Sequence, residues 1–494
     1  MRNKLQTFTD FANSLLPHET AYLLSIQQFQ DNERLDILKQ IDKNCQRTHP
    51  PNPFDEAIDK RKYSHLKIWI EERLQDIDVD AQYNSIVQWH QHLMTDTITP
   101  QEEKSLLKTI RTYPLSMDFY FVKFYELVKD FRQYLLIRMR YNEHQVADDF
   151  IKTYAEKYRY CCDTADTLYE ATCDMVNTYA QKAVEMSSDN TFSETRDWEE
   201  WLTQRYYDVQ LDGLNRYYAL VRLTFIYNNH RQFEKLKDKY DVIDALFEKG
   251  LFYSRRLLIN YYGNRLLFHT RFNEYDKAEF YGYLSISIKT SDYLHYVNNL
   301  AAILLRNKKN TEALSLMRQV HPEMKHTHSF HNKVGFMSFY GKCLNVNNLC
   351  RNAESYIESF LGVYRAEIFE QRWHLFFTTY LESLLGQKKY GKLLQIVKRY
   401  KLIEKEKQYR KSSACLLPIF LYNALCAYKE DLITFKDLQK IVTTEKKAFA
   451  ERSDRLHQFD DVLKNMRHHL NEVDKGRLIV EPKGTSIQKY PLSQ

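Results

Sequence analysis

The sequence predicts an all-α protein, and two observations support that prediction. Glycine and proline are scarce, with 11 and 10 among 494 residues. Strands joined by tight turns require glycine or asparagine–glycine pairs, so this scarcity argues against a sheet protein. Tyrosine (37) and phenylalanine (28) are abundant, and 28% of the residues are charged. Large rings on a polar, glycine-poor chain are typical of amphipathic helices with aromatic inner faces.

A short pattern recurs five times between about residues 214 and 400. Its copies start at a set of anchor residues: Phe233, Tyr275, Asn310, Cys350 and Tyr390. The anchors are 42, 35, 40 and 40 residues apart, and the residue thirteen positions before each of them is apolar. A period of this length corresponds to one pair of antiparallel helices, which buries its apolar face only against neighbouring pairs. We therefore predict that each anchor begins the second helix of a hairpin in a stack of hairpins.

The repeated unit resembles a tetratricopeptide repeat, in which a small residue stands three positions after the anchor and another nine before it. Three units have the first of these residues and two have the second, respectively Ala278, Ala313, Ala353 and Ala301, Gly341. Other units depart from the family at these positions, with Leu236, Leu266, Leu381 and Leu393. The closing proline of the family is also missing. The resemblance implies a right-handed α-solenoid in which the first helix of each hairpin lines a concave groove.

Helix-breaking residues and the periodicity of apolar residues divide the sequence into five predicted parts. Residues 1–115 form an N-terminal helical region, interrupted by a loop at residues 49–55 that holds three of the ten prolines. Residues 116–211 form long antiparallel helices because this stretch is almost free of helix breakers. Residues 212–430 form the solenoid. A capping helix at 431–474 and a flexible tail at 475–494 complete the chain.

The charge is distributed unevenly along the chain, although the net charge is only +6. Residues 1–200 carry 24 Lys and Arg against 34 Asp and Glu, whereas residues 251–450 carry 31 against 17. The hairpins are therefore basic and the N-terminal half is acidic. This opposition also allows the acidic half to fold against the basic hairpins and occupy their groove.

No motif of catalysis or of cofactor binding is present in the sequence. It contains no phosphate-binding glycine loop, no His-Glu-x-x-His motif, no kinase signature and no nucleophile elbow. The histidines at 321, 326, 328 and 331 have metal-like spacing, but no carboxylate or cysteine completes a ligand set, so we interpret them as part of a polar loop. We expect a non-catalytic protein with no cofactor and no metal site.

The cysteines and the most apolar run predict a reduced, cytoplasmic protein. Eight cysteines are scattered without a Cys-x-x-Cys pair, which fits neither a zinc site nor a disulfide framework. The start of the chain lacks the apolar core of a signal peptide. The run at 414–427 is too short to cross a membrane and contains Pro418 and Asn423. We therefore expect no membrane association.

The first helices of the hairpins supply the candidate binding groove. Asparagine can pair with a peptide backbone, and basic side chains can pair with carboxylates. The candidate groove residues are Arg222, Asn260, Asn264, Arg265, Asn298, Asn299, Lys333, Lys342, Arg372 and His374. They predict a scaffold or adaptor whose partner is another protein or peptide, acidic or extended.

A nucleic-acid-associated protein that uses the same basic face to bind RNA or single-stranded DNA is the alternative. Lys and Arg would neutralise phosphates there, and exposed rings would stack on bases. The two functions differ in their response to salt, since nucleic-acid binding weakens steeply as the salt concentration rises. The sequence does not indicate an oligomeric state.

Overall fold

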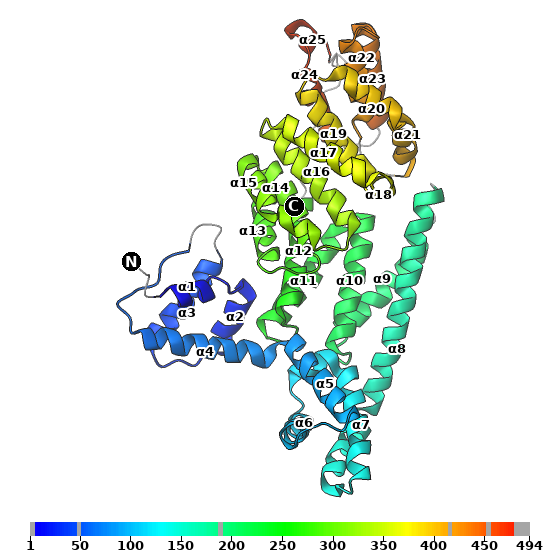
Figure 1. Cartoon of the computed structure of the whole chain (residues 1–494). Coiled ribbons are helices and arrows are strands. Elements are labelled where there is room, and N and C mark those ends of the chain that lie inside the picture. Colours follow the sequence, from blue (N-terminus) through cyan, green and yellow to red (C-terminus); the bar gives the residue numbers. More distant parts are fainter. Residues whose placement is uncertain (1–4, 47–50, 186–190, 413–416, 451–455, 479–494) are drawn as a thin grey trace, which may run out of the picture. The chain divides into compact units, whose positions relative to one another are not determined.

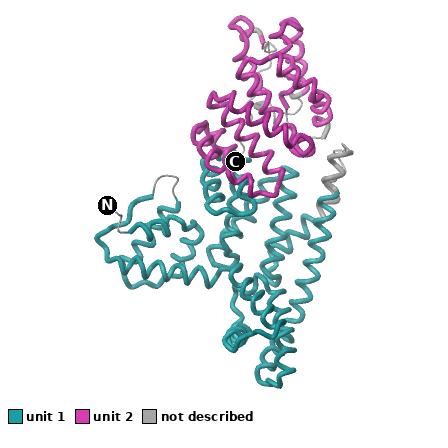
Figure 2. Tube along the Cα trace, in the orientation of Figure 1, with its two compact units in different colours: residues 1–182, 187–296 teal, residues 183–186, 297–494 magenta. Residues whose placement is uncertain are grey.

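A computed structural model describes residues 5–46, 51–185, 191–412, 417–450 and 456–478 of the chain (Figure 1). Every regular element within these residues is a helix, and they contain no strand. The all-α prediction is confirmed. The chain divides into two compact units (Figure 2): unit 1 comprises residues 1–182 and 187–296, and unit 2 comprises residues 183–186 and 297–494. The five-part division of the sequence stays a prediction.

Unit 1 begins with four helices whose buried apolar side chains belong to one large hydrophobic core: α1 (Gln6–Ala12), α2 (Pro17–Ile26), α3 (Asn32–Cys45) and α4 (Lys60–Ile77). A second group follows, namely α5 (Val79–Met94), α6 (Pro100–Thr112), η1 (Leu115–Tyr120), α7 (Phe121–Ile137), α8 (Tyr141–Glu185) and α9 (Thr191–Tyr207). Phe121, Phe124 and Phe131 of α7 are completely buried in the core of this second group. Within the stretch that is almost free of helix breakers, residues Tyr141–Glu185 thus form one helix of 45 residues, α8.

The remaining helices of unit 1 are α10 (Gly213–His230), η2 (Phe233–Leu236), α11 (Lys237–Glu248), α12 (Arg255–Arg271), α13 (Tyr275–Ser285) and the start of α14 (Tyr293–Arg306). In unit 2 the elements after α14 are α15 (Asn310–Val320), η3 (His321–Lys325), α16 (Phe330–Val346), α17 (Cys350–Val363), α18 (Arg365–Glu370), α19 (Trp373–Gly386) and α20 (Tyr390–Arg399). The chain continues through α21 (Leu402–Ser412), α22 (Ile419–Lys429), α23 (Phe435–Ala450), α24 (Leu456–Arg467) and α25 (Glu472–Arg477). The predicted tail therefore starts inside α25, and from residue 479 it lies outside the described residues.

Each of the five anchors begins a helix, as the sequence predicts. The elements η2, α13, α15, α17 and α20 start at the anchors in chain order. Two residues before each anchor the backbone turns through the left-handed region, with φ between 58° and 61° at Arg231, Asn273, Lys308, Asn348 and Lys388. None of these residues is glycine, and at each turn the N–H of the following residue donates to a carbonyl oxygen in the last turn of the preceding helix, for example Gln232 to Tyr227 and Lys389 to Leu384, both at 3.0 Å. The hairpins are therefore structurally equivalent units in a repeat-like arrangement.

The small residues of the pattern lie where helices approach each other closely. Ala278, Ala301, Ala313 and Ala353 have no exposed surface. At Gly341, an added Cβ would stand 2.9 Å from Ile357 Cδ1 and 3.0 Å from Thr379 Cγ2. A larger side chain at this position would push α17 and α19 away from α16, because a packed interior has no spare volume.

A buried carboxylate joins α17 to α20 in unit 2. Glu354 accepts hydrogen bonds from Lys389 Nζ and Lys392 Nζ, both at 2.6 Å, and from Gln387 Nε2 at 2.8 Å. Burial alone would raise the pKa of Glu354, but the hydrogen bonds from the two ammonium groups and the amide outweigh it and lower the pKa to about 2. The carboxylate therefore stabilises the folded state above its unfolded pKa, and this contribution disappears as the pH falls towards 2.

We expect Glu354→Gln to destabilise unit 2 by about 1–3 kcal/mol at pH 7, since it removes a buried partner of two ammonium groups. The difference from the unchanged protein should vanish near pH 2, where the native carboxyl group is also protonated. Chemical denaturation followed by circular dichroism at several pH values measures both effects. The exposed pair Glu472–Lys475 gives the control, and Glu472→Gln should change the stability very little. An equal effect of the two substitutions would contradict this account.

Candidate functional site

The ten candidate groove residues are divided between the two units. Arg222, Asn260, Asn264 and Arg265 belong to unit 1, and the other six belong to unit 2. Nine of the ten are partly buried, and Asn298 is only 1% exposed. Their contacts therefore decide which of them a partner can reach.

Arg222 is held by the long helix α8. Its Nε lies 2.6 Å from Thr172 Oγ1 and 3.1 Å from the carbonyl oxygen of Leu168, and its Nη1 donates to the carbonyl oxygen of Tyr218 at 3.0 Å. Burial lowers the pKa of this guanidinium. Arg222 therefore fastens α10 to α8.

The other three candidate residues of unit 1, Asn260, Asn264 and Arg265, form hydrogen bonds that connect neighbouring helices. Asn260 accepts a hydrogen bond from Tyr217 Oη at 2.9 Å and donates to Tyr296 Oη at 3.1 Å, and Asn264 donates to Asn260 at 3.2 Å. Arg265 donates to Tyr281 Oη at 3.1 Å. Because these bonds join α10, α12, α13 and α14, alanine at Arg265 or Asn260 would disturb the fold as well as any binding.

Acidic residues of the N-terminal half neutralise the arginines that begin α12. Glu19 of α2 is completely buried and accepts from Arg255 Nε at 2.7 Å, Arg255 Nη2 at 3.1 Å and Tyr253 Oη at 2.6 Å. Asp80 of α5 accepts from Arg256 at 2.8 and 2.9 Å. Within unit 1, α2 and α5 of the acidic N-terminal half are therefore joined to the start of α12, and the occupation of a groove by this half stays a prediction.

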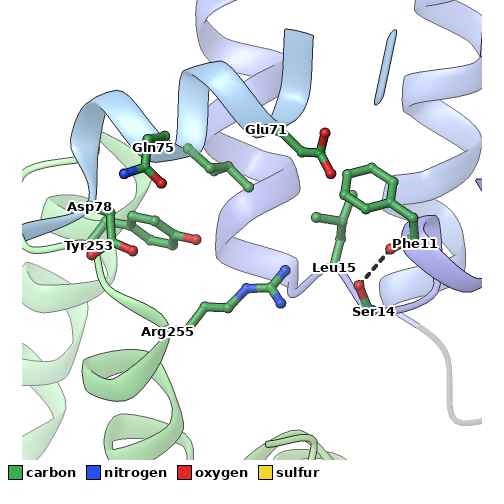
Figure 3. A pocket seen from close by; sticks show the side chains of 9 residues that line it. Phe11, Ser14, Leu15, Glu71, Gln75, Asp78, Tyr253 and Arg255 are labelled. Atoms are coloured by element: carbon green, nitrogen blue, oxygen red, sulfur yellow. Dashed lines mark hydrogen bonds between the residues drawn. The ribbon is translucent and has the colours of Figure 1, made fainter. Parts of the chain in front are cut away.

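An open cavity of about 360 Å³ lies beside the Glu19–Arg255 pair (Figure 3). Its lining residues are Phe11, Ser14, Leu15, Glu71, Leu74, Gln75, Asp78, Tyr253 and Arg255. Figure 3 shows the Arg255 guanidinium between the helices, with the Glu71 and Asp78 side chains also around the cavity. Since Glu19 already neutralises Arg255, this cavity offers no free cation to an anionic ligand.

In unit 2, two of the predicted residues converge on Gly335. Arg372 precedes α19 with a left-handed φ of 54°, and its side chain reaches α16. A Cβ added at Gly335 would collide with Arg372 Nη1 and would stand 3.0 Å from Asn298 Nδ2. Glycine in the middle of a helix costs about 1 kcal/mol relative to alanine. Gly335 is nevertheless found in α16 because the Arg372 guanidinium occupies the space that a side chain would need there.

The guanidinium of Arg372 has no acidic partner among the described residues, and burial lowers its pKa. His374 stacks on Tyr409 with ring centroids 4.5 Å apart. Burial, followed by the positive charges of Arg372 and His331, lowers the pKa of His374 to about 4. His374 is therefore neutral at pH 7 in a region of positive potential, and an anion that binds there would supply the missing counter-charge.

The two lysines of α16 lie on different sides of that helix. Lys342 follows Gly335 by seven residues, about two turns, and so shares its side. Lys333 precedes Gly335 by two residues and lies on nearly the opposite side. We define the Arg372 cluster as Arg372, His374, His331, Lys342 and the supporting Gly335. Gly335 was missed as a candidate, although a glycine inside a strongly helical pattern was a signal for it, and His331 was assigned to a polar loop but lies in α16.

The two asparagines of α14 differ in how far a partner can reach them. Asn298 donates from Nδ2 to the carbonyl oxygen of Asn332 at 3.2 Å, and its Oδ1 is buried without a hydrogen-bond partner. Asn298 therefore supports the start of α16 from inside the unit. Asn299 is partly buried beside it.

The described residues contain no group of three or more histidines, cysteines or carboxylates that could hold a metal ion. The polar-loop prediction is wrong for two of the four histidines: His321 belongs to η3, where its ring packs against Phe336, Tyr340 and Tyr356, and His331 belongs to α16. Across the described part of the chain, no helix combines the length and the apolar character needed to cross a membrane.

Comparison with known proteins finds no relative. No protein-family model matches the chain, and neither a curated protein nor a solved structure matches it.

Proposed function

We propose that this protein is a non-catalytic scaffold or adaptor that binds an acidic, extended segment of another protein at the Arg372 cluster of unit 2. The observation that carries the proposal is the Arg372 guanidinium, which is partly buried over Gly335 and has no carboxylate partner among the described residues. A cation removed from water is costly unless an anion pairs with it. A partner's carboxylate would provide that pair, and the planar guanidinium favours a bidentate contact.

We further propose that the hairpins form a right-handed, tetratricopeptide-like solenoid. Five turns with the same left-handed residue two positions before the anchor support equivalent, stacked units. So do the buried alanines at the small positions of the pattern. In such a stack the first helices, among them α16 and α19, line one face, which places the Arg372 cluster where an extended segment could lie along several units.

The binding test compares two substitutions that remove the same charge from one neighbourhood. A glutamate-rich synthetic peptide with a fluorescent label is titrated into the intact protein, and binding is followed by anisotropy. Arg372→Gln should weaken binding about tenfold or more, because a charge-assisted hydrogen bond contributes about 1.5–3 kcal/mol. Lys333→Gln, on the other side of α16, should leave the affinity unchanged.

The same titration with a labelled single-stranded oligonucleotide distinguishes the nucleic-acid alternative. We expect no Arg372-dependent binding of the oligonucleotide at low salt. Tight binding that falls steeply with salt and without sequence preference would instead support the alternative. Failure of the acidic peptide to bind, or equal effects of Arg372→Gln and Lys333→Gln, would overturn the proposal.

Gly335→Ala separates binding from folding. The added methyl group must displace the flexible end of the Arg372 side chain and presses on Nδ2 of the buried Asn298 at 3.0 Å, while alanine favours the helix by about 1 kcal/mol. Since these effects oppose each other, we expect a change in stability of less than about 1 kcal/mol in chemical denaturation together with weaker binding of the acidic peptide. A variant that binds as well as the unchanged protein would show that the position of the guanidinium does not matter.

A further inference from the structure

A second surface, on unit 1, differs in chemistry from the Arg372 cluster. Three apolar side chains of α10 are exposed, Tyr218 by 43%, Val221 by 40% and Phe225 by 41%. On α8, Tyr169 is 70% and Val176 is 54% exposed. Hydrogen bonds from Asn215 and Arg222 of α10 to the carbonyl oxygens of Cys161 and Leu168 of α8 bring the two helices together within unit 1. We call these five side chains the α8–α10 face.

The five side chains lie on one side of the helix pair. On α10, Arg222 stands four residues after Tyr218 and three before Phe225, so it lies within the apolar stripe. On α8, Thr172 stands three residues after Tyr169 and four before Val176. Arg222 Nε bonds Thr172 Oγ1 at 2.6 Å, which joins the two stripes side by side. Apolar side chains that gather in this way on a surface mark an interaction site more often than single exposed ones do.

Arg222 and Thr172, which lie within the face, are already bonded to each other, and Arg222 also donates to the carbonyl oxygens of Leu168 and Tyr218. An extended segment needs a partner for each of its backbone N–H and C=O groups, and beyond this pair the face offers the hydroxyls of Tyr169 and Tyr218, too few for such a segment. A helix satisfies its backbone internally and presents apolar side chains three, four and seven residues apart. The face therefore fits a helix better than an extended peptide.

Acidic residues of α8 border the face at Asp166 and Glu170, which stand three residues before and one residue after Tyr169. Asp163 and Asp174 are nine and two residues from Thr172 and therefore lie on nearly the opposite side of α8. Residues 160–177 contain four carboxylates and no lysine or arginine, and the four are Asp163, Asp166, Glu170 and Asp174. All four are exposed, and no cation of the described residues pairs with them. Asp166 precedes Tyr169 by three residues, so a carboxylate lies next to the largest exposed ring. This border repels an acidic partner and attracts a basic one.

From this apolar face with its acidic border, we infer that unit 1 binds an amphipathic helix of another protein whose polar side carries lysine and arginine. The occupant inserts its apolar side chains between Tyr169 and Phe225, and its cations lie over Asp166 and Glu170 of α8. This site goes beyond the proposed function, because it lies on the other unit and selects the opposite charge. The protein would then join an acidic and a basic partner segment.

The test uses the intact chain and a phage-displayed library of helical peptides. The library is panned on the protein and counter-selected on the variant Val221→Asp, which places a charge in the middle of the face at an already exposed position. We expect the recovered peptides to be amphipathic and rich in lysine or arginine. A recovered peptide, synthesised with a label, should bind Val221→Asp at least tenfold more weakly and Asp166→Lys with Glu170→Lys several-fold more weakly.

Ile137→Asp provides the matched control, because Ile137 is an exposed β-branched residue of unit 1 on α7, and it is 66% exposed. The recovered peptide should bind this variant as it binds the unchanged protein. The inference is overturned if no recovered peptide distinguishes Val221→Asp, if the recovered peptides are acidic, or if Ile137→Asp weakens binding as much as Val221→Asp does.

Discussion

Replacement of Glu19 by glutamine is expected to destabilise unit 1 by about 3–5 kcal/mol. The carboxylate has no exposed surface and accepts four hydrogen bonds, from Tyr253, twice from Arg255 and from the backbone N–H of Leu16 at 2.8 Å. Glutamine cannot neutralise Arg255, so a partly buried guanidinium would lose its counter-charge. Chemical denaturation followed by circular dichroism measures the loss.

Asp80 provides the matched comparison for Glu19. It makes the same bidentate contact with the neighbouring Arg256, but the Arg256 side chain is 55% exposed. Water can solvate that guanidinium when the carboxylate is removed, so Asp80→Asn should cost less than about 1 kcal/mol. Similar losses for the two substitutions would show that burial does not determine the strength of these contacts. A small loss for Glu19→Gln would show that the N-terminal helices are held mainly by apolar packing.

Asp212→Asn is expected to stabilise the protein by about 2–4 kcal/mol at pH 8 and to have little effect at pH 4. Asp212 is 1% exposed and caps α10 by accepting the backbone N–H of Asn215 at 3.0 Å. Burial raises its pKa to about 7, against the hydrogen bond from Asn215, and the charge of Asp118 adds to the rise while that of Lys157 opposes it. Asparagine keeps the cap and removes the buried charge.

The sign of this pH dependence follows from proton binding. Between about pH 4 and pH 7 the folded protein keeps a proton on Asp212 that the unfolded chain has released, so the stability falls as the pH rises through this range. Above pH 7 both states are ionised and the slope from this group disappears. Asp212→Asn should flatten the profile measured by denaturation at pH 5, 6, 7 and 8. An unchanged slope would contradict the raised pKa.

Asp31 is a suitable control because it is also a helix cap, accepting the backbone N–H of Glu33 at 3.0 Å. The hydrogen bond from Lys62 lowers the pKa of Asp31, so its charge is favoured in the folded state. Asp31→Asn should therefore reduce the stability slightly at pH 8, in the opposite direction to Asp212→Asn.

The hairpins could be predicted because the residues that define each hairpin lie close together in the sequence. Apolar residues, small residues and anchors recur at a fixed spacing, and all five anchors begin a helix in the structure. The sequence also showed that Lys333 and Lys342 lie on different sides of the same helix, since they are nine residues apart, which is two and a half helical turns. They were nevertheless assigned to one groove.

The contacts of the cations were not predictable, because their partners are distant in the chain. Glu19 and Arg255 are 236 residues apart, and Asp80 and Arg256 are 176 apart. A count of charges shows that the hairpins are basic, but it does not show which arginines are already neutralised. In unit 1 they are held by α2, α5 and α8, whereas in unit 2 Arg372 has no carboxylate partner among the described residues.

The sequence by itself determined that the chain is helical and where the second helix of each hairpin begins, since both depend on residue types at short, regular spacing. Only the tertiary structure decided which surfaces are available for binding. In the folded protein the arginines at the start of α12 pair with carboxylates of the N-terminal helices, and the Arg372 side chain lies over Gly335. The apolar stripes of α8 and α10 also come together there. Each of these outcomes depends on packing between segments that are far apart in the chain.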